Sequence, residues 1–300
     1  MVEEVACNIC GSQNEQELYP AGVAQNNRIV RCRVCGLMYA NPRPSQAAHE
    51  ALAERTDEEL AEVERGYMKQ RVEKETLQVR DYAATRQQLK SMYPNRGTLL
   101  EIGSGFGFLL AAFREDGWRV VGVDPDAQAS RYARDQNGVE AVTGTLLDAG
   151  LAPDSVDVVV MNHVIEHVPD PVAMLRQIHA VLKPTGHLVM ETPVYDSLSY
   201  RLLGRRERSL SCNGHIYFFT TPTLERSYRL AGFDLVDRRR VGRSLTLNRL
   251  AYNLGVMSKS KRVKAALEEL TRRFKLNEIA ITLNARDMER VCVRKMEAAP

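Results

Sequence analysis

Four of the six cysteines form two closely spaced pairs near the start of the chain: Cys7 and Cys10, then Cys32 and Cys35. Two such CxxC pairs suit four thiolate ligands around Zn²⁺, whereas a reducing cytosol argues against disulfides. A glycine follows each pair, Gly11 and Gly36, and permits the tight turn that points backbone N–H groups at sulfur. Four unrelated thiols would leave this repeated CxxCG spacing unexplained. The pattern predicts a structural zinc site, a small zinc-knuckle segment that allows a leader of residues 1–44 to fold.

A glycine-rich loop follows the predicted strand Thr98–Ile102 and carries three alternate glycines: Gly103, Gly105 and Gly107. Glycine lets backbone and ligand approach closely because no Cβ lies between them. A dinucleotide-binding G-x-G-x-x-G loop would need glycine where Phe108 stands, so the spacing disfavours a nicotinamide oxidoreductase. Glu101 precedes the loop, and Asp124 ends the next strand, where a carboxylate can accept hydrogen bonds from both ribose hydroxyls. The set predicts a nucleoside cofactor without a pyrophosphate, with a charged amino-acid end near the loop.

Candidate acid–base side chains occur in two segments. His163 and His167 follow an apolar strand, at the carboxyl edge of the sheet where substrates dock. His215 and Tyr217 lie in a glycine-supported loop, a usual place for an acceptor-binding insertion. We interpret Glu166 mainly as shaping the turn into the following helix. Each of the four either takes a proton from the group that reacts with the cofactor, the acceptor, or only positions that group, because a strongly nucleophilic acceptor needs no base.

From residue 98 onward, short apolar runs alternate with helix-like segments. Strands are predicted over residues 98–102, 119–123, 139–142, 156–161, 187–191 and 233–241, and a last strand over 289–294 or, alternatively, 278–283. Helices are predicted over residues 45–66, 68–92, 108–115, 126–136, 170–182 and 221–231. The alternation predicts an α/β fold, a doubly wound Rossmann-like parallel sheet with its ligand at the carboxyl ends of the central strands.

These motifs resemble class I S-adenosylmethionine-dependent methyltransferases, the group typified by ubiquinone-pathway and antibiotic-sugar methyltransferases. The resemblance covers about residues 98–240 and rests on the stretches LLEIGSGFGFLL, VVGVDPD, DVVVMNHVIEHVPDPVAML and LKPTGHLVMETP. It implies a seven-stranded methyltransferase sheet with an antiparallel seventh strand and S-adenosyl-L-methionine as the cofactor. The four-cysteine start also resembles the zinc-binding leader of some sugar C-methyltransferases.

The resemblance also implies cofactor contacts. Glu101 and the loop glycines face the methionine part of the cofactor, and Asp124 holds the ribose. The remaining contacts are with the adenine, from Thr145 and Leu146, and with the methionine side, from Asn162 and His163. An acid usually recognises the adenine amino group in this family. Thr145 stands there instead, so Asp148 or a backbone carbonyl is the candidate replacement.

Charge is distributed unevenly along the chain. Residues 1–198 hold 19 Lys and Arg against 28 Asp and Glu, whereas residues 199–300 hold 22 against 10. Arginines bind phosphate bidentately, so the basic part predicts an anionic acceptor, with solvated helix faces as the alternative. We expect four further divisions: a helical linker or lid over 45–96, a methyltransferase domain over 97–300, an acceptor loop over 198–220 and a helical insertion over 244–285.

The expected function is methyl transfer from S-adenosylmethionine to a small or carrier-linked acceptor. The alternative is a zinc-leader adaptor whose methyltransferase-like domain binds cofactor but is inactive. With 44% hydrophobic and 26% charged residues the composition is ordinary for a globular protein. The acidic start lacks signal-peptide features, and no apolar run approaches the roughly 20 residues of a membrane span, so we expect a cytoplasmic protein. No nucleic-acid motif is present; residues 245–257 are mildly amphipathic and suit either packing or peripheral membrane contact.

Overall fold

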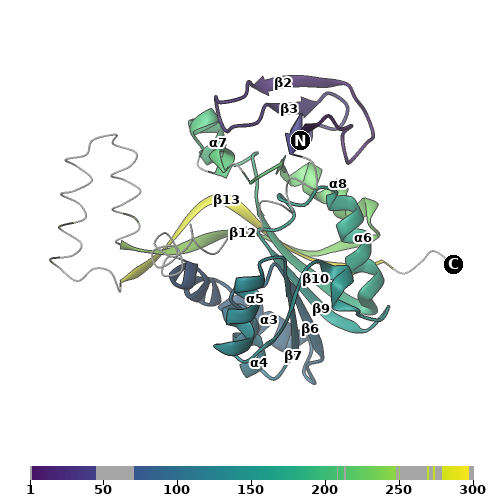
Figure 1. Ribbon diagram of the computed structural model, residues 1–300, viewed down its shortest axis with the longest axis vertical. Coiled ribbons are helices and arrows are strands. Elements are labelled where there is room, and N and C mark those ends of the chain that lie inside the picture. Colours follow the sequence, from purple (N-terminus) through teal and green to yellow (C-terminus); the bar gives the residue numbers. More distant parts are fainter. Residues whose placement is uncertain are drawn as a thin grey trace.

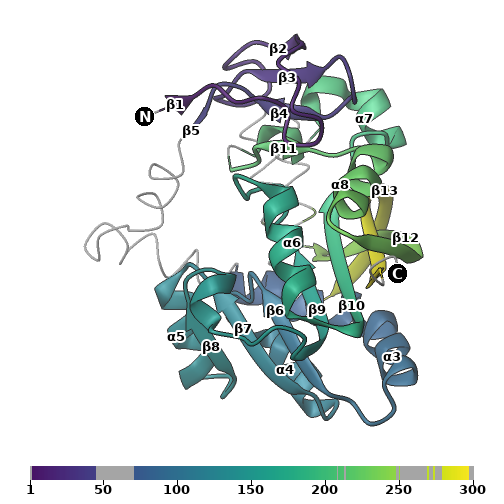
Figure 2. The same cartoon turned by 90° about the vertical axis from the view of Figure 1, so that its right-hand side faces the viewer.

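The structure, a computed structural model, describes residues 2–44, 71–207, 209–212, 214–247 and 279–296, together with residues 250, 269 and 273. A leader of short antiparallel strands lies at one end of the molecule, and helix α4 (Phe108–Glu115) lies at the other (Figures 1 and 2). The large α/β sheet fills the space between them. Any site at the carboxyl ends of its strands therefore faces the leader.

The large sheet has seven strands in the order β12-β13-β10-β9-β6-β7-β8. Its parallel strands are β6 (Thr98–Ile102), β7 (Arg119–Asp124), β8 (Glu140–Thr143), β9 (Val156–Asn162) and β10 (Leu182–Pro193). Strand β13 (Ala280–Lys295) runs antiparallel between β10 and β12 (Phe233–Thr246). The predicted doubly wound Rossmann-like methyltransferase sheet with one antiparallel strand is confirmed.

Helices cover both faces of this sheet (Figure 1). One face carries α3 (Ala83–Met92), α4 and α5 (Ala127–Asp135), and the other carries α6 (Pro171–Val181) and α8 (Thr221–Leu230). Alternate side chains of a strand point to opposite faces. Accordingly Val158 and Val160 pack with α3, α4 and α5, whereas Val159 and Met161 pack with α6 and α8. This two-sided burial explains why β9 is apolar along almost its whole length.

The leader completes its sheet with a strand borrowed from the acceptor loop. Its strands are β2 (Glu15–Tyr19), β3 (Ile29–Cys32) and β4 (Met38–Ala40), and β11 (Tyr217–Phe218) adds to β4, while β1 (Val2–Glu3) pairs with β5 (Arg43–Pro44). Val30 and Tyr39 of the leader are buried in the same cluster as Ile216 and Phe219. The leader and the methyltransferase sheet thus share one hydrophobic core.

Several predicted boundaries need correction. Strand β13 runs through both candidates for the last strand, because its outer half pairs with the end of β12, for example Ile281 opposite Leu245. Residues 244–246 and 280–285 are therefore strand, and the helical insertion predicted over 244–285 is wrong at both ends. This two-stranded extension is held by backbone pairing, and its residues on β13 have much exposed surface. Strand β10 also begins earlier than predicted, at Leu182.

The described part of the predicted linker is helical over residues 71–81 and in α3. The predicted helix over 45–66 and most of the segment 245–257 lie outside the described residues. Within the described part of the chain, no helix is both long and apolar enough to cross a bilayer.

Candidate active site and four-thiolate cluster

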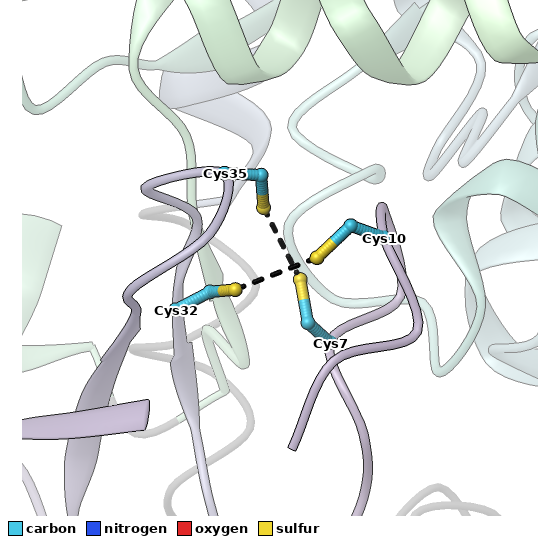
Figure 3. Close-up of side chains that lie close together, drawn as sticks. All are labelled: Cys7, Cys10, Cys32 and Cys35. Carbon is cyan, nitrogen blue, oxygen red and sulfur yellow. Dashed lines mark hydrogen bonds between the residues drawn. The ribbon is translucent and has the colours of Figure 1, made fainter. Parts of the chain in front are cut away.

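The four leader cysteines converge on one point (Figure 3). Their sulfur atoms approach in two pairs: Cys7 with Cys35 at 3.4 Å and Cys10 with Cys32 at 3.5 Å. These separations exceed the ~2.05 Å of a disulfide and approach the ~3.8 Å edge of a tetrahedron with ~2.3 Å metal–sulfur bonds. Gly11 and Gly36 have the left-handed φ values 70° and 81° that their turns require. The donor set and its geometry fit a closed four-thiolate zinc site.

The glycine loop joins the end of β6 to the start of α4 and is fastened to Asp124 at the end of β7. The Gly105 N–H donates to Asp124 Oδ2 at 2.8 Å, and the Asp126 N–H donates to Oδ1 at 2.9 Å. Gly103 and Gly105 have φ values of 72° and 53°, which glycine adopts readily. Asp124 is thereby held in one orientation at the carboxyl edge of the sheet, as its predicted ribose contact requires.

Glu101, near the end of β6, is a buried acid whose carboxylate can bind a cation. The residue is 3% exposed, and among the described residues Oε2 has no hydrogen-bond partner. Burial raises its pKa well above the ordinary value, and the charges of Glu75 and Asp124 add to the effect. An ammonium group would satisfy this carboxylate, and the amino-acid end of S-adenosylmethionine carries one. The residues of the loop therefore fit the expected cofactor.

The helix over residues 71–81 contacts the glycine loop directly. Glu75 Oε2 accepts a hydrogen bond from the Phe106 N–H at 2.9 Å, and a Cβ at Gly105 would lie 2.5 Å from Glu75 Oε1. Arg71 pairs with Glu75 at 3.2 Å and with Asp126 at 2.6 Å. Burial raises the pKa of Glu75 to about 7. Glycine at position 105 therefore has a packing reason as well as a ligand-binding one.

The remaining predicted cofactor residues lie along the same edge. Thr145 and Leu146 follow β8, where Thr145 begins a short 3₁₀ helix and bonds to Asp148 through both its N–H and its hydroxyl at 2.7 Å. These bonds lower the pKa of Asp148, so this carboxylate is already engaged locally. Gly107 immediately precedes α4, and a Cβ there would crowd Ala133 at 3.0 Å, which gives this glycine a role in packing. The contacts of Thr145 and Leu146 with an adenine stay predictions.

Asn162 ends β9 on the side predicted for the methionine part of the cofactor. Its Oδ1 accepts a hydrogen bond from the Tyr82 hydroxyl, and its Nδ2 has no partner within the described residues. The side chain is buried. The amide nitrogen of Asn162 therefore has hydrogen-bonding capacity that no described residue uses.

Glu166 lies at the centre of three histidines that come from two separate segments. Its Oε1 is 3.4 Å from His163 Nδ1 and 4.0 Å from His215 Nε2. The His167 ring lies 4.7 Å from the His215 ring, edge to face. Three of the predicted catalytic residues thus come together. The Glu166 carbonyl also accepts hydrogen bonds from the Ile216 and Tyr217 N–H groups, which ties the two segments together. Its predicted part in the turn into the following helix stays a prediction, and the sequence interpretation missed the role of its carboxylate.

Electrostatics give the members of this cluster different charges. Burial alone would lower the pKa of His163, but its bonds to Glu166 and Glu191 outweigh burial and raise it. Burial would raise the pKa of Glu166, yet the hydrogen bond and charge of His163 hold it at about 2. Burial lowers the pKa of His215 to about 4. The shifts thus favour an ionised Glu166 carboxylate and the charged form of His163 beside a neutral His215 imidazole.

A second buried carboxylate fixes His163 from the other side. Glu191 Oε1 lies 3.5 Å from His163 Nε2, and Glu191 Oε2 accepts two hydrogen bonds from Arg290 at 2.8 and 2.6 Å. Glu191 and Arg290 are direct cross-strand neighbours in β10 and β13. His163 itself has a left-handed φ of 54°, a costly conformation that a surrounding network must hold. The sequence signal of this pair was weak, since Glu191 ends one predicted strand and Arg290 lies beside Glu289 at the start of another.

The leader holds the loop that carries His215 through strand pairing and hydrogen bonds. Tyr217 lies opposite Tyr39 in the pairing of β11 with β4, and the Ala40 N–H donates to the Ile216 carbonyl at 2.9 Å. Arg43 donates to the Tyr217 hydroxyl at 2.8 Å and to the Pro169 carbonyl at 2.7 Å. The hydroxyl of Tyr217 in turn donates to Pro169 at 2.9 Å. These contacts give Tyr217 a structural role, and its part in proton transfer stays a prediction.

The first half of the acceptor loop forms α7 (Leu198–Leu203) and a 3₁₀ turn, Gly204–Arg206. Arg201, Arg205 and Arg206 are exposed there. Arg208 lies outside the described residues. The loop thus has a basic outer end and a histidine at its inner end.

Comparison with known families places this architecture. The family model described as "Methyltransferase domain" matches residues 68–238, more than half of the chain, and the chain belongs to this family. The match includes the helical segment 71–92 and strands β6 to β10, and it ends within β12. Nothing in the match or in the site favours the inactive adaptor.

Individual relatives give the same class. An uncharacterized methyltransferase of Mycobacterium avium (strain 104) is 37% identical over 103 residues, 33% of this chain and 40% of that protein. Another, of Mycobacterium sp. (strain JLS), is 38% identical over 112 residues, 34% of this chain and 41% of that protein. The chain thus matches only about 40% of the length of these relatives.

Solved structures of similar fold include two S-adenosylmethionine-dependent methyltransferases. The one from Mesorhizobium loti is 20% identical and aligns with a TM-score of 0.47 over 72% of this chain and 99% of that chain. The one from Archaeoglobus fulgidus is 19% identical, with a TM-score of 0.47 over 71% of this chain and 93% of that chain.

Proposed function

We propose that this chain transfers the methyl group of S-adenosylmethionine to a small or carrier-linked acceptor. One observation carries the proposal: a glycine loop with the buried acids Glu101 and Asp124 shares an edge of the sheet with the Glu166–histidine cluster. The carboxyl ends of β6, β7 and β9 supply both groups. In open α/β sheets ligands bind at this edge, so cofactor and acceptor would meet there.

The cofactor, when bound, supplies a methyl group on a sulfonium sulfur, which a nucleophile displaces in line. The chain has to bind and orient it. Glu101 would hold its ammonium group, Asp124 its ribose hydroxyls, and Asn162 would donate from Nδ2 on the methionine side. These three side chains are buried at the ends of adjacent strands, which makes the predicted contacts compatible with one bound molecule.

Within the cluster, His215 is the candidate base. Its imidazole is neutral near neutral pH, because burial holds its pKa at about 4, and its Nδ1 has no hydrogen-bond partner within the described residues. As the new bond to carbon forms, the acceptor's proton would pass to this ring, and the Glu166 carboxylate would stabilise the resulting imidazolium. His163, clamped by two carboxylates, would position Glu166.

The acceptor would carry phosphate or another acid. This part of the proposal rests on the arginines at the outer end of the acceptor loop, which have the geometry to bind phosphate oxygens bidentately. Neutralising Arg205 and Arg206 together should raise the KM for the acceptor at least threefold and leave cofactor affinity unchanged. An equal loss of both would refute the assignment.

We further propose that the leader binds one structural Zn²⁺ through Cys7, Cys10, Cys32 and Cys35. The convergence of four sulfur atoms supports it. Such a site leaves no ligand position open for substrate, so its role would be to fold the leader that holds the acceptor loop.

Two measurements test the central activity. Calorimetric titration of the zinc-loaded protein should show binding of S-adenosylmethionine, and Asp124→Asn should weaken it about tenfold or more, because a charged hydrogen-bond acceptor is lost. Asp135→Asn, at the exposed end of α5, is the matched control. Labelled cofactor is then incubated with fractionated cell extract, and the methylated product is identified by mass spectrometry. Absence of cofactor binding by the wild type would overturn the proposal.

A further inference from the structure

We propose that α7 and the turn that follows it form a contact surface for an anionic lipid membrane. This leucine–arginine surface consists of six residues: Leu198, Leu202, Leu203, Arg201, Arg205 and Arg206. It lies beside the leader in both views of the molecule (Figures 1 and 2). No established property of the methyltransferase sheet requires it.

The apolar part of the surface consists of three leucines that the fold leaves uncovered. Leu198, Leu202 and Leu203 are 62%, 76% and 45% exposed. The opposite side of the same helix packs against the leader. Tyr200 contacts the buried cluster that includes Ile29 and Met38 of the leader, and its hydroxyl lies 3.1 Å from the hydroxyl of Tyr19. Single exposed leucines are ordinary, but three on one six-residue helix form a patch with its inner face already anchored.

The arginines identify the partner. In the described part of the chain, Arg201, Arg205 and Arg206 have no carboxylate within ion-pair distance, whereas Arg238, Arg240 and Arg290 each pair with an acid. Three uncompensated guanidinium groups beside three leucines match a surface of phosphate headgroups over acyl chains. Arginines near such a surface are attracted to it, and the leucines can enter the headgroup boundary. A soluble phosphate would explain the arginines but not the leucines.

The location gives the contact a purpose. Helix α7 lies in the segment that joins β10 to β11, and the inner end of that segment carries His215. A membrane seated on α7 would bring a lipid-linked acceptor to the mouth of the candidate site. The inference in this form rests on the proposed function, but membrane binding itself can be measured without cofactor or acceptor.

The test is co-sedimentation of the full-length protein with vesicles of equal parts phosphatidylcholine and phosphatidylglycerol, beside vesicles of phosphatidylcholine alone. We expect binding to the anionic vesicles only, weakened by added salt. The triple change Arg201→Gln, Arg205→Gln and Arg206→Gln should reduce binding at least tenfold, since each cation near an anionic surface contributes severalfold. The triple change of the three leucines to serine should also reduce it at least threefold.

Matched controls separate this surface from general stickiness. Leu147→Ser removes a leucine that is 71% exposed near β8, and Arg131→Gln removes an exposed arginine on α5. Both controls should bind vesicles like the wild type. The inference is overturned if the wild type does not bind anionic vesicles, if both triple variants bind as well as the wild type, or if sedimentation shows that the leucines instead join two copies of the chain. Cofactor titration of each variant verifies folding, and a failure here leaves the methyl-transfer proposal standing.

Discussion

Two clusters in this molecule bring potential metal ligands within 4.8 Å of one another, yet their surroundings differ. In the leader, the thiols contact chiefly one another, in a segment whose strands have two to five residues. In the acceptor site, Glu166 is already tied to His163 and to Thr192, and His167 is tied to the Gly214 carbonyl at 2.8 Å. The comparison teaches that proximity alone does not define a metal site. The four thiols form the donor set that the proposed zinc site requires, whereas the second cluster is already engaged in hydrogen bonds and ion pairs within the protein.

The two clusters are nevertheless connected through strand pairing and hydrogen bonds. Strand β11 runs from the His215 segment into the leader sheet, and Arg43 bonds to both the loop and the turn before α6. Damage to the thiolate cluster should therefore reach the histidines, while damage to the histidines should leave the leader intact. The predictions below test this one-way dependence.

The largest effect is expected for Cys7→Ser. Structural zinc contributes on the order of 10 kcal/mol to the folding of small domains, so its loss should unfold the leader and release the acceptor loop. Methyl transfer should fall at least about a hundredfold, and calorimetry should show cofactor affinity within about twofold of the wild type. Cys212→Ser, which changes an exposed thiol outside the cluster, is the control and should retain activity. Full activity in Cys7→Ser would break the proposed dependence.

His215→Gln should come next. Removing a general base costs about 10²- to 10⁴-fold in rate, so kcat should fall by that factor with the Kd for cofactor unchanged. Steady-state and binding measurements separate the two quantities. His179→Gln, on α6, serves as a matched histidine control. A fall in kcat of less than about threefold would mean that His215 only positions the acceptor.

Glu166→Gln should change how the stability of the protein and the titration of His163 depend on pH. In the wild type the folded pKa of Glu166 is about 2, below its ordinary value, so its stabilisation is present above about pH 4.5 and is lost as pH falls toward 2. The free energy of unfolding of the Glu166→Gln variant should not show this decrease toward low pH. His163 also loses one of the two partners that raise its pKa, so proton NMR should show its imidazolium deprotonating at lower pH than in the wild type. An unchanged His163 titration would contradict the ion pair.

Arg43→Gln should have the smallest effect. It removes the hydrogen bonds of Arg43 to Tyr217 in the acceptor loop and to Pro169 in the turn before α6, together with its ion pair to Glu3. The β4–β11 pairing stays, so we expect about a threefold to tenfold loss of kcat/KM with zinc content unchanged. Arg33→Gln, at an exposed leader position, should behave like the wild type. Activity equal to wild type in Arg43→Gln would show that strand pairing alone positions the loop.

The sequence predicted most of the fold because local patterns determine it. Apolar runs, the caps at Asp126 and Asp170, and the glycines after Ile102 each specify structure within a few residues. The four cysteines were equally readable, since their types and spacing alone indicate the chemistry.

What could not be predicted depends on contacts between distant segments. The addition of Tyr217 to the leader sheet, the register that sets Glu191 opposite Arg290, and the placement of Glu75 on the glycine loop all join residues that no local pattern relates. Glu166 was underestimated for the same reason. Its partners include His215, which only the folded loop brings near.

The most direct test of this division between the two clusters is the metal content of purified protein by elemental analysis. The wild type and the double variant His167→Gln, His215→Gln should each contain about one zinc per chain, and Cys7→Ser should contain close to none. A second equivalent of metal in the wild type that disappears with the two histidines, or zinc retained in full by Cys7→Ser, would contradict the account.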